Sequence, residues 1–277
     1  MSTTTTAPAG RYVDVNGVSL YVETHGSGRP LILLHGGLMS GEMFAPVLPA
    51  LTQTRQVITV DLQGHGRTAD VDRPITLESM ADDVAALIGH LDLDRPDLVG
   101  YSLGGGVALQ VAAKHPDSIG RLVLTSVYIR SDALDPAIAA QQAQVNGAAA
   151  EFMIGTPPYE HYQQVAPRPE DFPGLLDKLG AWMANEFDYT EQIRGLRMPT
   201  LIVAADADMA PVRHFSDVFA LLDGGLRDGG WDGSGRPSGG HALAILPGRT
   251  HYDITESPLF AATVLDFLRA TGEQDAR

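Results

Sequence analysis

The sequence contains no cysteine. This absence excludes disulfide bonds, thiolate metal ligands and a cysteine nucleophile, and it is compatible with either redox compartment. Long hydrophobic runs are also missing, because no apolar stretch approaches the roughly 18 residues needed to cross a bilayer. We therefore expect neither a disulfide-stabilised protein nor a membrane-spanning one.

Basic residues are scarce relative to acidic ones. The 277 residues include 19 Lys and Arg against 34 Asp and Glu, which gives a net charge of -15. Such a charge repels nucleic acids, anionic membrane surfaces and polyanionic substrates, so we expect none of these as partners. Residues 1–10 lack the basic start and the apolar block of a secretory signal. We interpret them as a disordered tail and expect the protein to be cytoplasmic.

Short apolar runs predict a sheet. Asn16-Gly17 favours a hairpin turn between Val13–Val15 and Val18–Glu23, which are expected to be antiparallel strands. Further runs, apolar enough for a parallel sheet that is covered on both faces, are Leu31–Leu34, Val57–Val60, Leu98–Gly100, Leu122–Thr125, Leu201–Ala204 and Leu243–Leu246. The pattern predicts an α/β fold with a mostly parallel, doubly wound sheet of about eight strands.

Helical patterns separate several of these strands. Thr76–Leu91 is one of them, and the last helix is marked by a Ser257 cap, Pro258 in its first turn and Gly272 beyond its end. We expect the core to comprise residues 11–127 and 199–271, with 272–277 as a tail.

The alternation of strands and helices lapses between residues 128 and 198, which predicts an inserted helical lid. Most of its large apolar side chains are expected to pack the insertion onto the core. As a group they indicate a roof over an apolar substrate pocket, with Trp182 and Met183 as candidate substrate contacts. The group consists of Phe152, Met153, Tyr159, Tyr162, Phe172, Leu175, Trp182, Met183, Phe187 and Tyr189.

Gly100-Tyr101-Ser102-Leu103-Gly104 is the most informative motif. It joins the apolar run Pro96–Val99 to a small-residue helix over Leu103–His115, so Ser102 lies on a strand-to-helix turn. Such a nucleophile elbow is strained, and glycine two places either side relieves the clashes. The backbone N–H of Leu103 opens the helix without an intrahelical acceptor and can bind an oxyanion. Ser102 is therefore a candidate nucleophile.

A serine nucleophile needs a base and an acid that orients it. In a doubly wound sheet, reactive groups gather after the carboxyl ends of strands. His251 follows the last strand run through residues 247–250, which are expected to form a loop, whereas His35 is expected to be structural and His65 is a minor candidate for substrate contact. Asp206 and Asp208 both follow Leu201–Ala205, and local pattern does not separate them.

The order Ser102, Asp208, His251, together with the elbow and His35-Gly36-Gly37, resembles the α/β-hydrolase superfamily in its esterase and cofactor-free haloperoxidase-like branch. The resemblance implies that Asp208 is the acid, in a Gly-x-x-Asp pattern whose glycine is replaced by Ala205. It also implies an oxyanion hole formed by the amides of Gly37 and Leu103, with Leu38 as the alternative donor. Leu38 and Tyr101 are the core residues expected to contact substrate.

These residues predict a serine esterase for small apolar substrates. The same triad also serves lactone opening, carbon–carbon bond hydrolysis and perhydrolysis, and a ligand receptor on this fold is the alternative from another class. Epoxide and haloalkane hydrolysis need an aspartate at position 102. No cofactor or metal site is indicated.

The glycine-rich segment 224–240 departs from the family pattern. We expect it to leave the sheet on the side away from Ser102, as a surface loop or as a contact between the subunits of a homodimer.

Overall fold

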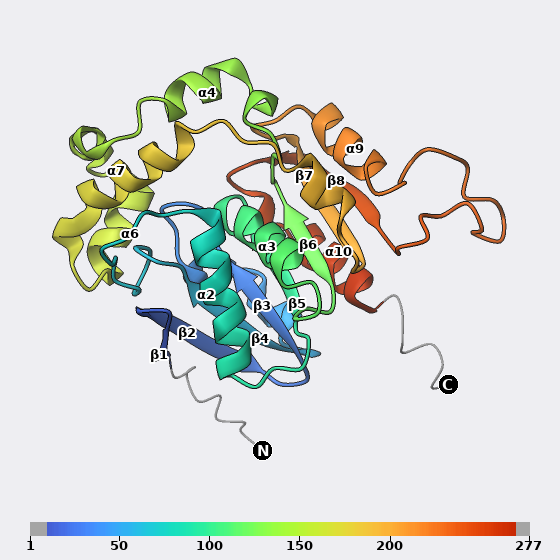
Figure 1. The fold of residues 1–277 in the computed structure, drawn as a ribbon, viewed down its shortest axis with the longest axis horizontal. Coiled ribbons are helices and arrows are strands. Elements are labelled where there is room, and N and C mark those ends of the chain that lie inside the picture. Colours follow the sequence, from blue (N-terminus) through green and yellow to red (C-terminus); the bar gives the residue numbers. More distant parts are fainter. Residues whose placement is uncertain (1–9, 270–277) are drawn as a thin grey trace.

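The structure, a computed structural model, describes residues 10–269. Apart from Gly10, the expected tails at residues 1–10 and 272–277, which include Gly272, lie outside the described residues. One eight-stranded sheet runs through the molecule (Figure 1). Its strands are β1 (Arg11–Val15), β2 (Val18–Gly26), β3 (Arg29–Leu34), β4 (Arg55–Asp61), β5 (Asp97–Tyr101), β6 (Leu122–Thr125), β7 (Thr200–Ala207) and β8 (Ala242–Thr250).

The strand order is β1-β2-β4-β3-β5-β6-β7-β8. Only the β1/β2 and β2/β4 pairs are antiparallel. Asn16 and Gly17 have φ of 46° and 82°, so both adopt the left-handed conformation that a tight hairpin turn needs. The predicted fold, an α/β protein with a mostly parallel, doubly wound sheet, is confirmed.

Helices cover both faces of this sheet, because its central strands are apolar on both sides. On β3, Leu31 and Leu33 belong to one hydrophobic cluster, while Ile32 and Leu34 belong to the other. Helices α2, α3 and α9 pack on the Ile32 side, and α1 and α10 pack on the Leu31 side. The helices are α1 (Leu48–Leu51), α2 (Leu77–His90), α3 (Leu103–Lys114), α4 (Pro136–Gln142), α5 (Ala150–Met153), α6 (Pro157–Val165), α7 (Phe172–Met183), α8 (Thr190–Arg194), α9 (Val212–Ala220) and α10 (Pro258–Arg269).

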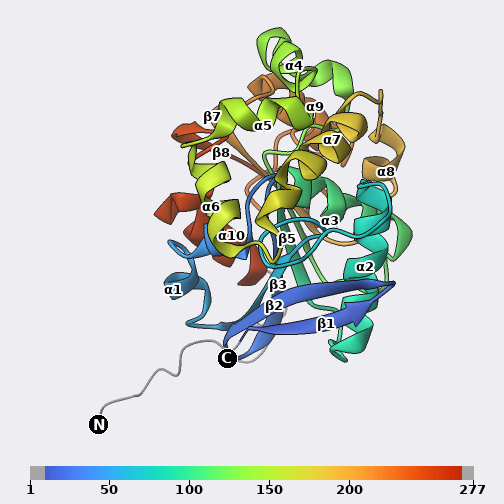
Figure 2. The same ribbon diagram turned by 90° about the vertical axis from the view of Figure 1, so that its left-hand side faces the viewer.

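Helices α4 to α8 all lie in residues 128–198, which we call the insertion, between β6 and β7. Figures 1 and 2 both show α4 to α7 beyond one end of the sheet, on the side opposite the β1–β2 hairpin. Four of the five helices have nine residues or fewer. The insertion is therefore a set of short elements rather than a second layered core.

Strands β7 and β8 are longer than the sequence pattern predicts. Strand β7 continues through Asp206 to Ala207, and β8 includes residues 247–250, which we expected to form a loop. The Asp206 carboxylate accepts the backbone N–H groups of Gly248 and Arg249 at 2.8 and 3.0 Å. These bonds bridge the irregularity between the Ala205–Leu246 and Ala207–Thr250 pairs, so the pairing of the two strands extends past the apolar runs.

The glycine-rich segment 224–240 lies between α9 and β8. It projects from the sheet on the side away from the insertion (Figure 1). Its last glycine, Gly240, approaches Pro199, which immediately precedes β7. The segment thus meets the sheet at the amino ends of the strands, as the topology predicts, and Trp231 within it is fully exposed.

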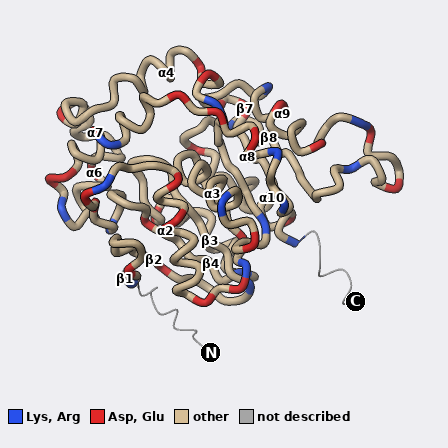
Figure 3. Tube along the Cα trace, viewed as in Figure 1, with Lys and Arg blue, Asp and Glu red and all other residues tan. Residues whose placement is uncertain are grey.

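Acidic side chains are distributed over the core and the insertion alike (Figure 3). Among residues 10–269, none of the helices combines the length and the apolar character that a membrane span requires.

Candidate active site

Ser102 lies at the turn between β5 and α3 with φ 51° and ψ -117°, a conformation that is costly for a residue with a side chain. A Cβ at Gly100 would come within 2.3 Å of the Gly104 carbonyl oxygen. A Cβ at Gly104 would come within 2.4 Å of the carbonyl oxygens of Leu34 and His35. The close packing of this turn therefore requires glycine at both positions, as the motif predicts.

His251 brings the serine and the acid together. Its Nε2 lies 3.1 Å from Ser102 Oγ, and its Nδ1 lies 2.8 Å from Asp208 Oδ1. The histidine directly follows β8 and is 4% exposed. Three side chains from the ends of β5, β7 and β8 thus form one hydrogen-bonded relay, which the sequence order predicts.

The Asp208 carboxylate accepts hydrogen bonds on both of its oxygens. Oδ1 also accepts the Met209 N–H at 2.8 Å, while Oδ2 accepts the Ser126 hydroxyl at 2.6 Å and the Ala205 N–H at 3.0 Å. Burial alone would raise the pKa of this carboxyl group, but the hydrogen bonds from His251, Ser126 and Ala205 outweigh it and lower the pKa. The carboxylate stays ionised and fixed in orientation.

Asp206 has a different role. It lies within β7, and its oxygens bind the backbone of Gly248 and Arg249, which lowers its pKa. Of the two candidate acids, only Asp208 is hydrogen-bonded to His251.

Ser126 was missed by the sequence reasoning. It directly follows β6, with φ 54°, and its N–H is bonded to the Val203 carbonyl at 2.8 Å. Its position at the carboxyl end of a central strand was the available signal, since the same rule selected His251 and the aspartates.

Tyr101 holds the backbone at His251. Its hydroxyl donates to the His251 carbonyl oxygen at 2.6 Å, and the two rings lie 5.2 Å apart. Burial raises the pKa of the Tyr101 hydroxyl, so it remains a donor. The Tyr101 side chain lines the pocket, and its hydroxyl binds the His251 backbone. Tyr101 therefore positions His251 and also forms part of the pocket wall.

The loop after β3 approaches the elbow. A Cβ at Gly36 would lie 3.4 Å from Ser102 Cβ, and one at Gly37 would lie 3.9 Å from a methyl group of Leu103. Leu38 has φ 62°, so the chain turns sharply here. Leu103 is the first residue of α3, and its N–H has no acceptor within the helix. Gly37 and Leu103 both line the pocket beside Ser102.

A pocket of about 560 Å³ opens at Ser102 and His251. The sequence-predicted contacts Leu38, Tyr101, Trp182 and Met183 all line it. Most other lining side chains are apolar, and sequence reasoning did not single out Met39, Met43, Leu77, Val127, Val145, Leu179 and Met209. The pocket lies between the core and the insertion, because both contribute to its wall.

Four of the ten large side chains expected to roof the pocket line it: Trp182, Met183, Phe187 and Tyr189. The other six serve elsewhere. Phe172 and Leu175 are buried in the core cluster, whereas Phe152 is 87% exposed. The expectation that most of the ten pack the insertion onto the core therefore fits their positions.

His35 and His65 are structural. His35 is fully buried, with Nδ1 on the Gly36 carbonyl at 2.7 Å and Nε2 on the Leu62 N–H at 3.0 Å. His65 is also buried, with Nδ1 2.8 Å from the Gln63 carbonyl. Burial lowers the pKa of His35 to about 4 and that of His65 to about 3. Neither lines the pocket.

A second serine–histidine contact joins the insertion to the core. Ser40 Oγ lies 2.7 Å from Nε2 of His161 on α6, and His161 Nδ1 is 3.9 Å from Glu42. Ser40 has an extended backbone with φ -141°, and its hydroxyl also accepts the Glu42 N–H. It does not line the pocket at Ser102, so the contact is a tie between the insertion and the core.

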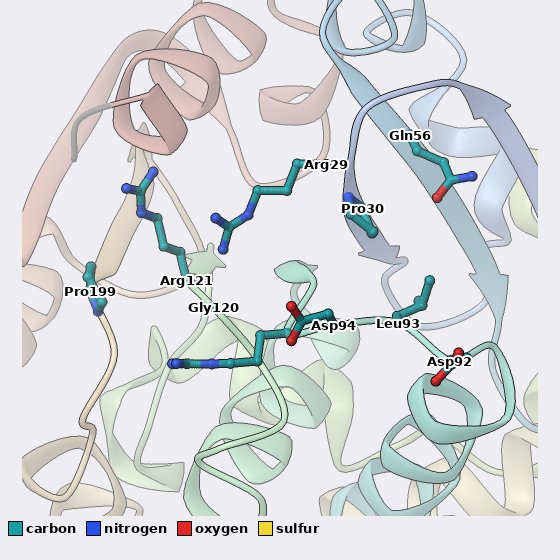
Figure 4. A pocket seen from close by; sticks show the side chains of 10 residues that line it. Arg29, Pro30, Gln56, Asp92, Leu93, Asp94, Gly120, Arg121 and Pro199 are labelled. Atoms are coloured by element: carbon teal, nitrogen blue, oxygen red, sulfur yellow. The ribbon is translucent and has the colours of Figure 1, made fainter. Parts of the chain in front are cut away.

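A separate hollow of about 860 Å³ lies at the amino ends of the strands (Figure 4). Arg29 and Arg121 line it. The arginines in this region have structural partners: Arg29 and Arg55 pair with buried Asp97, and Arg55 and Arg121 donate to the Leu268 carbonyl near the end of α10. Nothing among these partners forms a nucleophile–base pair.

Within residues 10–269, no three His, Asp or Glu side chains gather closely enough to hold a metal ion.

Comparison with known proteins gives one family match. A family model described as alpha/beta hydrolase fold matches residues 29–156. The structure of a thermophilic esterase from Thermogutta terrifontis superimposes with a TM-score of 0.70 at 25% identity, and covers 95% of this chain and 98% of that one.

Two curated relatives align over shorter segments. A Rhizobium rhizogenes protein that carries a carbamate hydrolase name is 38% identical over 118 residues, 41% of this chain and 45% of that protein. The pimeloyl-acyl-carrier-protein methyl ester esterase of Neisseria meningitidis is 42% identical over 108 residues, 39% of this chain and 40% of that protein. In these alignments the chain spans less than half the length of either relative.

Proposed function

Because the chain belongs to the α/β-hydrolase superfamily, we propose that it is a serine hydrolase that cleaves carboxylic esters of small apolar substrates through an acyl-enzyme intermediate. One observation carries the proposal: Ser102 Oγ, His251 and Asp208 form a continuous hydrogen-bonded relay at the mouth of an apolar pocket.

The first half of the reaction forms the acyl-enzyme. Ser102 Oγ attacks the ester carbonyl while His251 Nε2 takes the hydroxyl proton, and the N–H at Nδ1 donates to ionised Asp208. The tetrahedral oxyanion accepts the amides of Gly37 and Leu103. His251 then gives its proton to the departing alcohol, and the carbonyl re-forms on Ser102.

The second half releases the acid. Water enters, His251 takes one of its protons, and the resulting nucleophile attacks the acyl carbonyl; the proton then returns to Ser102 as the carboxylic acid leaves. In this proposal the insertion acts as a lid that excludes bulk water from the apolar pocket and holds the substrate. Its contribution of Trp182, Met183, Phe187 and Tyr189 to the pocket wall supports that role.

Labelling with a fluorophosphonate tests the nucleophile and separates an enzyme from an inert ligand receptor. The wild type is expected to react at one site and to hydrolyse p-nitrophenyl esters, and Ser102→Ala is expected to lose both. Ser40→Ala is the matched control, because within residues 10–269 it removes the other hydroxyl that is hydrogen-bonded to a histidine ring.

Labelling that persists in folded Ser102→Ala, with folding checked by circular dichroism, would refute the assignment. Lactone opening, carbon–carbon bond hydrolysis and perhydrolysis use the same triad and are assayed in parallel. The reaction with the highest kcat/KM then identifies the reaction type.

A further inference from the structure

We propose that the pocket selects uncharged esters that carry an aromatic ring, and that Trp182, Phe187 and Tyr189 recognise this ring. The inference rests on the proposed ester hydrolysis at Ser102 and specifies its substrate class. The three residues, which we call the aromatic wall, all line the pocket.

The rings of the aromatic wall lie nearly parallel to one another. Trp182 and Phe187 have ring centroids 6.5 Å apart and planes inclined by 13°, and Phe187 and Tyr189 have centroids 5.0 Å apart and planes inclined by 22°. A ligand ring can extend this stack at its end or lie across the ring edges. Both offset-stacked and edge-to-face contacts favour an aromatic ligand over a saturated ring of similar size, by roughly two- to tenfold in binding.

Backbone hydrogen bonds hold the aromatic wall in place. The Tyr189 N–H donates to the Ile129 carbonyl at 2.8 Å, and the Ser131 N–H donates to the Phe187 carbonyl at 3.1 Å. Residues 130 and 188 also form an antiparallel bridge. Segment 187–189 is thus paired with the chain just after β6. Because the wall is built before a ligand enters, little ordering is needed on binding.

The charge of the lining excludes anionic substrates. Among the described residues that line the pocket there is no lysine and no arginine, whereas Glu256 is present at the surface and Asp208 lies behind His251. A carboxylate that enters the pocket loses its hydration and finds no cation in return. The polar pair away from the triad is the neutral Tyr128 and Gln142, whose hydroxyl and amide oxygen lie 3.3 Å apart.

The pocket volume of about 560 Å³ limits the size of the substrate. It lies within the range of pockets that bury most of a drug-sized ligand, so one ring, a short linker and an ester group fit together.

Matched substrates test the aromatic preference. Methyl 3-phenylpropanoate and methyl 3-cyclohexylpropanoate place the ring on the acyl side, while 2-phenylethyl acetate and 2-cyclohexylethyl acetate place it on the alcohol side. Within each pair the carbonyl has nearly the same intrinsic reactivity. We expect kcat/KM to favour the aromatic member of at least one pair by about two- to tenfold. Phe187→Leu and Trp182→Leu should reduce that ratio.

Phe152→Leu is the control for these variants, because Phe152 is an aromatic residue of the insertion that is 87% exposed and does not line the pocket. It should leave the ratio unchanged. Equal rates within both pairs in the wild type, or a ratio that survives Phe187→Leu and Trp182→Leu together, would overturn the aromatic assignment.

A third matched pair of substrates tests the charge preference. The dimethyl and monomethyl esters of 1,4-benzenediacetic acid share a ring and an ester but differ by one carboxylate. The diester should be preferred on the order of 100-fold, and Gln142→Arg, which adds a cation to the lining, should narrow this gap. Comparable rates for the two esters in the wild type would contradict the exclusion of anions.

Failure of this inference differs from failure of the proposed function. If no ester is hydrolysed and the fluorophosphonate does not label Ser102, the proposed function is wrong and the substrate class falls with it. If labelling and ester turnover depend on Ser102 but neither matched comparison shows selectivity, only the inference about the substrate is wrong.

Discussion

The two halves of the pocket are built in different ways. On the core side, Ser102, His251 and Asp208 follow the ends of sheet strands and are joined by hydrogen bonds of 3.1 and 2.8 Å. On the insertion side, the wall consists of apolar and aromatic side chains from short helices and the segment that joins α7 to α8. In the function that we propose, the sheet positions the reacting groups, while the insertion selects the molecules that reach them.

Asp206, within β7, and Asp208, just after its end, provide the strongest test of this division between core and insertion. Asp208→Asn keeps the shape of the acid but removes the charge that stabilises protonated His251, so kcat should fall by about 10⁴-fold, as in other serine hydrolases. Asp206→Asn should leave kcat nearly unchanged and lower the stability of the β7–β8 extension. Steady-state kinetics and urea unfolding of both variants decide the matter. Equal losses of kcat would contradict the assignment of Asp208.

The close packing of the strand-to-helix turn at Ser102 gives a test of the core side of the pocket. Gly104→Ala places a Cβ within 2.4 Å of two backbone oxygens, so we expect a loss of several kcal/mol in the free energy of unfolding, or failure to fold. Gly89→Ala is the matched control in α2, where a Cβ would meet nothing within 4 Å. It should stabilise the protein by about 0.5–1 kcal/mol. Thermal unfolding measures both, and a fully stable Gly104→Ala would show that the elbow is looser than its geometry indicates.

Ser126 offers a finer test of how the acid is held. Ser126→Ala removes one of the two donors to Asp208 Oδ2, which should lower kcat about tenfold through a less well oriented His251. A change in the pH profile of kcat/KM should accompany the loss. A purely structural role would instead lower the stability and leave the pH profile unchanged.

The buried histidines His35 and His65 in the core predict that the stability of the protein depends on pH. His35 and His65 have pKa values lowered by burial to about 4 and about 3, against about 6.5 in the unfolded chain. Below pH 6.5 the unfolded state therefore binds more protons than the folded state, and stability falls as the pH falls. Asp61 acts in the opposite sense, because burial raises its pKa to about 6 and its contribution is lost as pH rises through that value. Two histidines outweigh one carboxyl group between pH 6 and 4.

Urea unfolding from pH 7 to pH 4 measures this effect. His65→Gln should reduce the slope of unfolding free energy against pH by about 1.4 kcal/mol per pH unit below pH 6. An unaltered slope in His65→Gln would mean that this histidine is not held neutral by burial.

The sequence predicted the fold, Ser102 and His251 because these depend on local signals, whereas the choice of Asp208 came from the resemblance to the α/β-hydrolase superfamily. Apolar runs such as Leu31–Leu34 predict strands that are covered on both faces, and the glycines around Ser102 mark a turn that no other residue type allows. What distinguishes Asp208 from Asp206 is how far β7 extends, and that depends on pairing with β8 rather than on local pattern.

The insertion was less predictable for the same reason. Its short helices give little periodicity, so the sequence singled out Trp182 but not Phe187 or Tyr189 as an aromatic residue that faces the pocket. Phe152 and Phe187 are similar in sequence context, yet the first is exposed and the second lines the pocket through its pairing with the Ser131 backbone. Ser126 escaped notice because its role lies in a single contact with Asp208 across two strands.

Trapping of the acyl-enzyme tests the central claim most directly. The protein is mixed with a p-nitrophenyl ester, quenched in acid within the first turnovers, and examined by peptide mass spectrometry. We expect the mass of the acyl group on Ser102, together with a burst of p-nitrophenol close to one equivalent per chain. Turnover without any acylated peptide and without a burst, or acylation at another residue such as Ser40, would contradict the account.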